Sequence, residues 1–167
     1  IGISIDNKEY DTTNAATISG TANLSGVLFA DFSNVTLGGT PSAVFNDASV
    51  ADNKPVTVSG YSISGSAAGN YTLAQPTGLT ANITLRSITI VGLTADDKIY
   101  DQTTSATVSG TASLAGILPG DESNISLSGS PTATFDTATF GTNKSVAVTG
   151  YSVTGSALGN YVIVPLI

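Results

Sequence analysis

The chain has 167 residues, of which 41% are hydrophobic and only 10% are charged, and it carries a formal net charge of −7. Its five basic residues are too few for the patch that neutralises nucleic-acid phosphates, which argues against nucleic acid as a partner. Cysteine and histidine are absent, which excludes disulfides, soft-metal sites and the usual catalytic triads. No apolar run is long enough to insert into a membrane.

The sequence contains one unit twice, at an offset of 90 residues. Residues 1–77 align with residues 91–167 without a gap, and 37 of these 77 pairs are identical. A period of this length marks whole domains in tandem and not the short repeats of a solenoid. We therefore expect two domains, at residues 1–86 and 87–167, in a chain cut from a longer protein.

Short β-type runs separated by turn residues follow one another along each copy. Val, Ile, Thr and Tyr dominate these runs, and no window shows a convincing 3.6-residue apolar period. The pattern predicts an all-β fold with two tandem immunoglobulin-like β-sandwich domains. An α+β unit of ubiquitin-like shape is the alternative, but it needs a long helix that the sequence lacks. In chain order, the strands of the first copy are predicted at 1–5, 16–20, 35–37, 43–45, 54–59, 61–64, 71–73 and 80–85.

A tyrosine follows a Gly-Asn corner in each copy, at Tyr71 and Tyr161. Its place at the start of a late strand is typical of the immunoglobulin tyrosine corner, whose hydroxyl bonds back to the backbone just upstream. A plain core tyrosine after a turn is the alternative. Strand alternation predicts that these tyrosines face the core together with Val56, Val58, Ile63 and Leu73 and the copies Val146, Val148, Val153 and Ile163.

Several short motifs recur in the same order in both copies. In the first copy they are Lys8-x-Tyr10-Asp11-x-Thr13, the turn at Asp31, Phe45, Asn53-Lys54-x-Val56, Gly60-Tyr61 and Gly69-Asn70-Tyr71. This order resembles the YDG repeat of large bacterial surface adhesins, and the resemblance covers both halves of the chain. It implies an extracellular place on the bacterial cell surface, a part in cell adhesion and biofilm, and no known active site.

The chain departs from the family pattern at two turns. The family's glycine after Tyr-Asp is replaced by Thr12 in the first copy and by Gln102 in the second. The Gly-Asp turn stands as Gly120-Asp121 in the second copy but as Ala30-Asp31 in the first. If the family glycine has a positive φ, we expect these copies to turn differently.

The residues that we single out form a structural motif, and we expect neither catalytic nor cofactor-binding residues. Asp11 and Asp101 precede hydroxyl residues and can accept a hydrogen bond from the backbone N–H two residues on, which is typical of turn capping. A glycosidase would instead need two carboxylates facing each other in a cleft. The motif residues are Lys8, Tyr10, Asp11, Asn70 and Tyr71, with the copies Lys98, Tyr100, Asp101, Asn160 and Tyr161.

All four lysines occupy matched positions, Lys8 with Lys98 and Lys54 with Lys144. The simplest interpretation is an ion pair, or a stem packed over the sheet with its head in water. The alternative is an amide bond from a buried, neutral lysine to one of the matched asparagines at positions 34, 53 and 70 and their copies.

We expect no such amide bond, although Lys8 and Lys98 are the places where the alternative stays open. Intact mass decides, since each Lys–Asn bond would release one ammonia. A deficit of two ammonias that disappears when both lysines are changed to Arg would contradict the expectation.

Calcium is a second alternative for the acidic residues. Asp96 and Asp97 follow the junction between the copies, where carboxylates could share a hard cation with backbone oxygens. However, no Asp-x-Asp-x-Asp loop occurs, and the first copy has Asp6-Asn7 at the same place. Scattered surface acids usually face water, so we expect no bound metal.

The junction at residues 83–91 contains no Pro-, Gly- or Ser-rich flexible tract. We therefore expect a stiff pair of domains from the stalk of a secreted adhesin, which extends a binding domain from the cell surface. The expected partners are other repeats of the same polypeptide. The alternative is a binding module for host or matrix glycan or for neighbouring adhesin copies, and exposed aromatics such as Tyr61 and Tyr151 would favour it.

Overall fold

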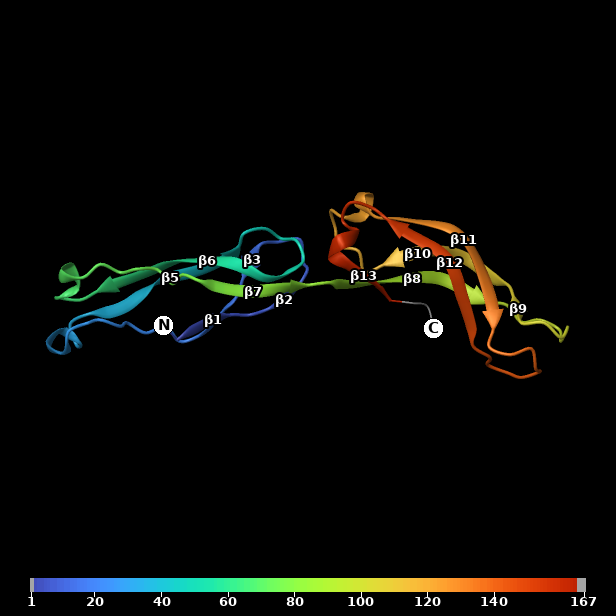
Figure 1. The fold of residues 1–167 in the computed structure, drawn as a ribbon, viewed down its shortest axis with the longest axis horizontal. Helices are drawn as coiled ribbons and strands as arrows, with labels where there is room; N and C mark the ends of the chain where they lie inside the picture. The colour runs from blue at the N-terminus through green and yellow to red at the C-terminus, as the bar shows by residue number, and fades with distance from the viewer. Residues whose placement is uncertain (1, 165–167) are drawn as a thin grey trace. The chain divides into compact units, whose positions relative to one another are not determined.

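A computed structural model describes residues 2–164 and divides the chain into two units, Ile1–Thr84 and Leu85–Ile167 (Figure 1). The sequence predicts this boundary after Arg86. Every regular element in the described range is a β-strand or a single-turn 3₁₀ helix, so the prediction of an all-β fold is confirmed. In the same range, no helix is long and apolar enough to cross a membrane. The immunoglobulin-like form of the sandwich stays a prediction.

The first unit contains a two-stranded and a five-stranded sheet. Neighbouring strands are antiparallel except for β2 and β7, which run parallel. The pair is β1 (Ile3–Ile5) with β4 (Ile18–Gly20), and the larger sheet has the order β2 (Lys8–Glu9), β7 (Leu79–Thr84), β6 (Ala51–Ser64), β5 (Thr36–Phe45), β3 (Ala15–Ala16). The 3₁₀ turns are η1 (Phe29–Asp31) and η2 (Ala68–Asn70).

The second unit contains two three-stranded sheets. One has β8 (Arg86–Ala95) at its centre, between the antiparallel β10 (Val108–Ala115) and the parallel β13 (Tyr161–Val164). The other has the order β12 (Val146–Thr154), β11 (Ser126–Phe135), β9 (Ser105–Ala106). The 3₁₀ turns are η3 (Glu122–Asn124) and η4 (Leu158–Asn160).

Two long strands in the first unit replace four short ones that the glycines had suggested. The predicted strands 35–37 and 43–45 join into β5, and 54–59 and 61–64 join into β6. The β5–β6 register shifts between Gly39 and Ser42, and Gly60 lies opposite this irregularity with a φ of 92°. The glycines therefore mark a bulge inside a continuous ladder and not a turn between strands.

The core forms where alternation predicted it, but not with every predicted residue. Val56 and Val58 are buried in the first unit, and Tyr161 is buried in the second. Tyr71, Ile63 and Leu73 are half-buried, as are Val146, Val148 and Val153. The prediction for Ile163 is wrong, because this side chain is 38% exposed on β13, the edge strand of its sheet among the described residues.

The predicted strand at 71–73 is absent from the first unit, although its copy forms β13 in the second. In the second unit β13 pairs in parallel with Arg86–Thr89, the first part of β8.

We predict that Gly60→Ala destabilises the first unit by about 1–3 kcal/mol. An added Cβ would collide with the carbonyl oxygen of Thr40, and alanine disfavours the left-handed backbone at this position. Chemical denaturation measures the loss. Gly69→Ala is the matched control, since its Cβ meets nothing within 4 Å. Equal effects of the two substitutions would contradict the bulge interpretation.

Candidate functional site

A cluster of three side chains closes the first turn of each unit, and we call it the Lys–Asp–Thr cluster. In the first unit it consists of Lys8, Asp11 and Thr13. The Lys8 Nζ lies 2.7 Å from the Asp11 Oδ1, and it also donates to the carbonyl oxygen and hydroxyl of Thr13, at 2.7 and 3.0 Å. Lys98, Asp101 and Thr103 repeat the arrangement in the second unit, at 2.7, 2.9 and 2.9 Å.

The aspartate of the cluster caps the turn, as the sequence predicted. The backbone N–H and the hydroxyl of Thr13 both donate to the Asp11 Oδ1 at 2.9 Å, and Thr103 does the same to Asp101. One residue lies between the aspartate and the threonine of each cluster. It is Thr12 in the first unit and Gln102 in the second, and their φ values are 69° and 65°. Both copies therefore turn in the same way, although neither has a glycine at this position. The backbone enters the region that glycine favours, held there by the cap.

Electrostatics stabilise the ionised aspartate of both clusters. In the second unit the hydrogen bond from Lys98, followed by those from the Thr103 backbone and hydroxyl, lowers the pKa of Asp101 to about 2. Burial opposes ionisation of Asp11, but the bonds from Lys8 and Thr13 together outweigh it and lower the pKa of that carboxyl. The cluster is thus an ion pair at neutral pH, the simplest role that the sequence offered for Lys8 and Lys98.

Each cluster lysine also contacts the core. The Lys8 Nζ lies 5.8 Å from the centre of the Phe45 ring, and the Lys98 Nζ lies 5.5 Å from that of Phe135. These distances are within the range of a cation–π interaction. The cluster therefore joins a surface turn to the core beneath it, which is a structural role.

The other matched lysines are ion-paired as well, but with acids at shifted positions. Lys54 is only 5% exposed, and its Nζ lies 2.7 Å from the Asp47 Oδ1. Its copy Lys144 lies 2.9 Å from Asp136, which is the counterpart of Asn46 and not of Asp47. The carboxylate has moved by one residue along the loop while the ion pair is kept.

The matched tyrosines bond far upstream, which differs from the expected tyrosine corner. The Tyr71 hydroxyl accepts from the Leu28 N–H at 3.1 Å and donates to the Asp31 carboxylate at 2.8 Å. Tyr161 makes the same two bonds, to Leu118 and Asp121. These partners lie 43 and 40 residues upstream, so the hydroxyl ties a late corner to the loop before β5 or β11.

The remaining motif residues have backbone roles. Asn70 and Asn160 end the η2 and η4 turns, where their N–H groups donate to Ala67 and Ala157 at 3.1 and 3.0 Å. The Asp96 N–H donates to the Thr107 carbonyl at 3.0 Å. Between residues 2 and 164, no group of three or more metal-ligating side chains surrounds Asp96 and Asp97 or any other position.

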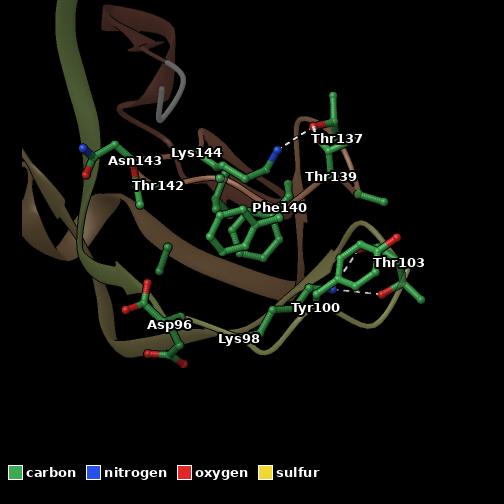
Figure 2. Close-up of a pocket in the computed structure, with 16 residues that line it drawn as sticks. Asp96, Lys98, Tyr100, Thr103, Thr137, Thr139, Phe140, Thr142, Asn143 and Lys144 are labelled. Atoms are coloured by element: carbon green, nitrogen blue, oxygen red, sulfur yellow. Dashed lines mark hydrogen bonds between the residues drawn. The ribbon is translucent and has the colours of Figure 1, made fainter.

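Sequence reasoning missed a groove in the second unit, whose volume is about 590 Å³ (Figure 2). It lies between the Lys–Asp–Thr cluster and the loop that leads into β12, with Asp96, Tyr100 and Asn143 among its lining residues. Tyr100 is 59% exposed here, whereas its copy Tyr10 is 6% exposed in the first unit. This contrast between two matched motifs is the structural signal of the groove, and only comparison of the two folded units reveals it.

Comparison with known proteins agrees with the internal duplication. The YDG domain family model matches residues 1–78 and, separately, residues 84–166, which confirms the resemblance seen in the motifs. No curated protein and no solved structure matches the chain.

We predict that Asp101→Asn flattens the acid dependence of stability. Because the folded-state pKa of Asp101 is lowered to about 2, the carboxylate stabilises the fold above about pH 4, and this contribution is lost as the pH falls toward 2. Urea denaturation of the wild type and the variant between pH 5 and 2 measures the difference. Glu122→Gln, an exposed carboxylate in η3, is the control. Parallel stability curves for wild type and Asp101→Asn would disprove the role of the ion pair.

Proposed function

Because the chain belongs to the YDG domain family over both of its units, we propose that it is a tandem repeat segment of a secreted bacterial adhesin. Its function is then to extend a binding domain from the cell surface as a stiff, non-catalytic stalk. The observation that carries this proposal is the junction, where Leu85 alone separates the end of β7 from the start of β8. A single residue between two strands offers no flexible linker.

The ion pairs and tyrosine hydrogen bonds inside each unit support an extracellular role. A chain without cysteine has no disulfides to stabilise small domains outside the cell. Here each unit instead has two lysine ion pairs and one tyrosine hydroxyl that joins distant segments. These contacts recur in both copies, which suits a module used repeatedly in one polypeptide.

The alternative function is direct binding of a glycan or of a neighbouring adhesin copy. Exposed side chains at Tyr61 and Tyr151 would favour this alternative. Both tyrosines are half-buried, so they do not support it. Two other aromatic residues at the groove of the second unit do favour it, since Tyr100 is 59% and Phe140 88% exposed. A glycan array probed with the whole chain tests this alternative, and specific binding would replace the stalk as the main function.

We predict that the two units behave in solution as a stiff, extended pair, with a maximum dimension on the order of 70–80 Å from strands of ordinary length. Small-angle X-ray scattering measures this dimension and the spread of conformations. The control variant carries a Gly-Gly-Ser-Gly insertion after Leu85, which should broaden the distribution. A compact profile, or identical profiles for both proteins, would contradict the stiff junction. A profile that bends when chelator is added would indicate a cation near Asp96 and Asp97.

A further inference from the structure

The first unit begins with a segment that is bonded to strands on two sides. Residues 2–10, which we call the leading segment, contain β1 and β2. β1 pairs antiparallel with the early strand β4, whereas β2 pairs in parallel with β7, which ends the unit (Figure 1). The leading segment therefore joins the two-stranded sheet of the unit to its five-stranded sheet.

Hydrogen bonds extend the pairing with β4 beyond both ends of the short ladder. The Asp6 N–H donates to the Thr17 carbonyl at 3.1 Å, and the Thr21 N–H donates to the Gly2 carbonyl at 3.0 Å. The Ser19 hydroxyl also donates to the Asp6 carboxylate at 2.6 Å. The first half of the leading segment is thus bonded to β4 and its flanks along its whole length.

The second half of the leading segment is bonded to β7 in the same way. The Asn82 N–H donates to the Asn7 side chain at 2.7 Å, and the Tyr10 N–H donates to the Thr84 carbonyl at 3.0 Å. The Thr84 hydroxyl donates to the Lys8 carbonyl at 3.3 Å. The start and the end of the unit are therefore tied directly to each other.

Side chains anchor the leading segment as well. Ile5 and Tyr10 are buried, with exposed fractions of 9% and 6%. The Lys8 ammonium holds the Lys–Asp–Thr cluster together and lies over the ring of Phe45 in β5. A displacement of the segment along its axis would withdraw apolar side chains from the core and break charge-assisted hydrogen bonds.

The parallel pairing determines how tension along the chain acts on these contacts. In a parallel pair, the N-terminal end of one strand and the C-terminal end of the other lie at opposite ends of the ladder. Tension reaches β2 from its N-terminal side and β7 from its C-terminal side, so it pulls the two strands past each other. The contacts between them then resist together. In an antiparallel hairpin pulled at its open end, by contrast, the pairs break one after another.

The second unit holds its first strand in the same arrangement. β8 pairs antiparallel with the early strand β10, and its first part pairs in parallel with the late strand β13. The parallel ladder joins residues 86–89 to residues 161–164. A first strand between an early antiparallel and a late parallel neighbour is therefore a property of the repeat and not of one copy.

We propose that the first unit is a mechanical clamp, in which the leading segment resists tension by shear against β4 and β7. This function goes beyond that of a stalk that only extends a binding domain. A clamp keeps the unit folded while the chain is pulled, because the rate of forced unfolding depends on the barrier to breaking the loaded contacts. The clamp depends on pairings within one unit and not on the stiffness of the junction.

Force-clamp measurements on the whole chain test the proposal by comparing two pulling directions. In the terminal geometry, handles are attached through a tag before Ile1 and at Leu85→Cys, a position that is 44% exposed. In the hairpin geometry they are attached at Thr36→Cys and Ser64→Cys, which are exposed partners in the β5–β6 ladder. The chain has no cysteine of its own, so each handle has a single site.

At the same force, we expect unfolding to be at least about tenfold slower in the terminal geometry, since several hydrogen bonds must break together there. Equal rates in the two geometries, or faster unfolding in the terminal one, would overturn the proposal. Attachment at position 85 leaves the junction outside the loaded path. The result therefore does not depend on whether the stalk proposal is correct.

A variant tests whether the contacts with β7 resist the pull. Asn7→Ala removes the acceptor of the Asn82 N–H, and we expect about fivefold faster unfolding in the terminal geometry and no change in the hairpin geometry. Asn23→Ala is the matched control, because this exposed asparagine donates to the Thr21 carbonyl at 3.2 Å, outside the leading segment. Equal acceleration by the two substitutions in the terminal geometry would overturn the proposal. Equal acceleration by Asn7→Ala in both geometries would also overturn it, because Asn7 would then act through overall stability alone.

Discussion

The pairing of β7 along both of its edges is the interaction on which the first unit depends. A strand in this place satisfies the backbone groups of two neighbours and buries Ile83, whose removal from water is worth about 1.5–3 kcal/mol. Tyr10, Phe45 and Lys54 are all buried in that unit. Their copies are more exposed in the second unit, where the strand has no counterpart among the described residues.

The same dependence explains why the lysines are ion-paired in both units despite their different burial. Lys54 lies in β6 beside Ala81 of β7 and is buried, and a buried ammonium needs a partner, which Asp47 provides. Lys144 stands at an open groove and keeps its acid all the same, although that acid has moved to Asp136. The ion pair is thus kept at both degrees of burial, so it does not depend on a dry environment.

The sequence was sufficient for the all-β class, the duplication and the capping of the turn by Asp11 and Asp101, since each follows from local chemistry or periodicity. It was not sufficient at Gly60, where a bulge and a turn call for the same residue. It also failed at 71–73, because a strand needs a partner segment that composition does not reveal. The groove could not be predicted for the same reason, because its two sides are segments far apart in the sequence, residues 95–103 and 135–146.

These observations indicate that the unit that folds completely is shifted relative to the 90-residue sequence repeat. Thr84 ends the last strand of the first unit, and Arg86 begins the first strand of the second. The first part of β8 supports β13, and Ile88 within it is 0% exposed, so this segment belongs to the core of the second unit. A domain that starts at the beginning of β8 and ends with a β7-type strand would contain every pairing seen in either unit.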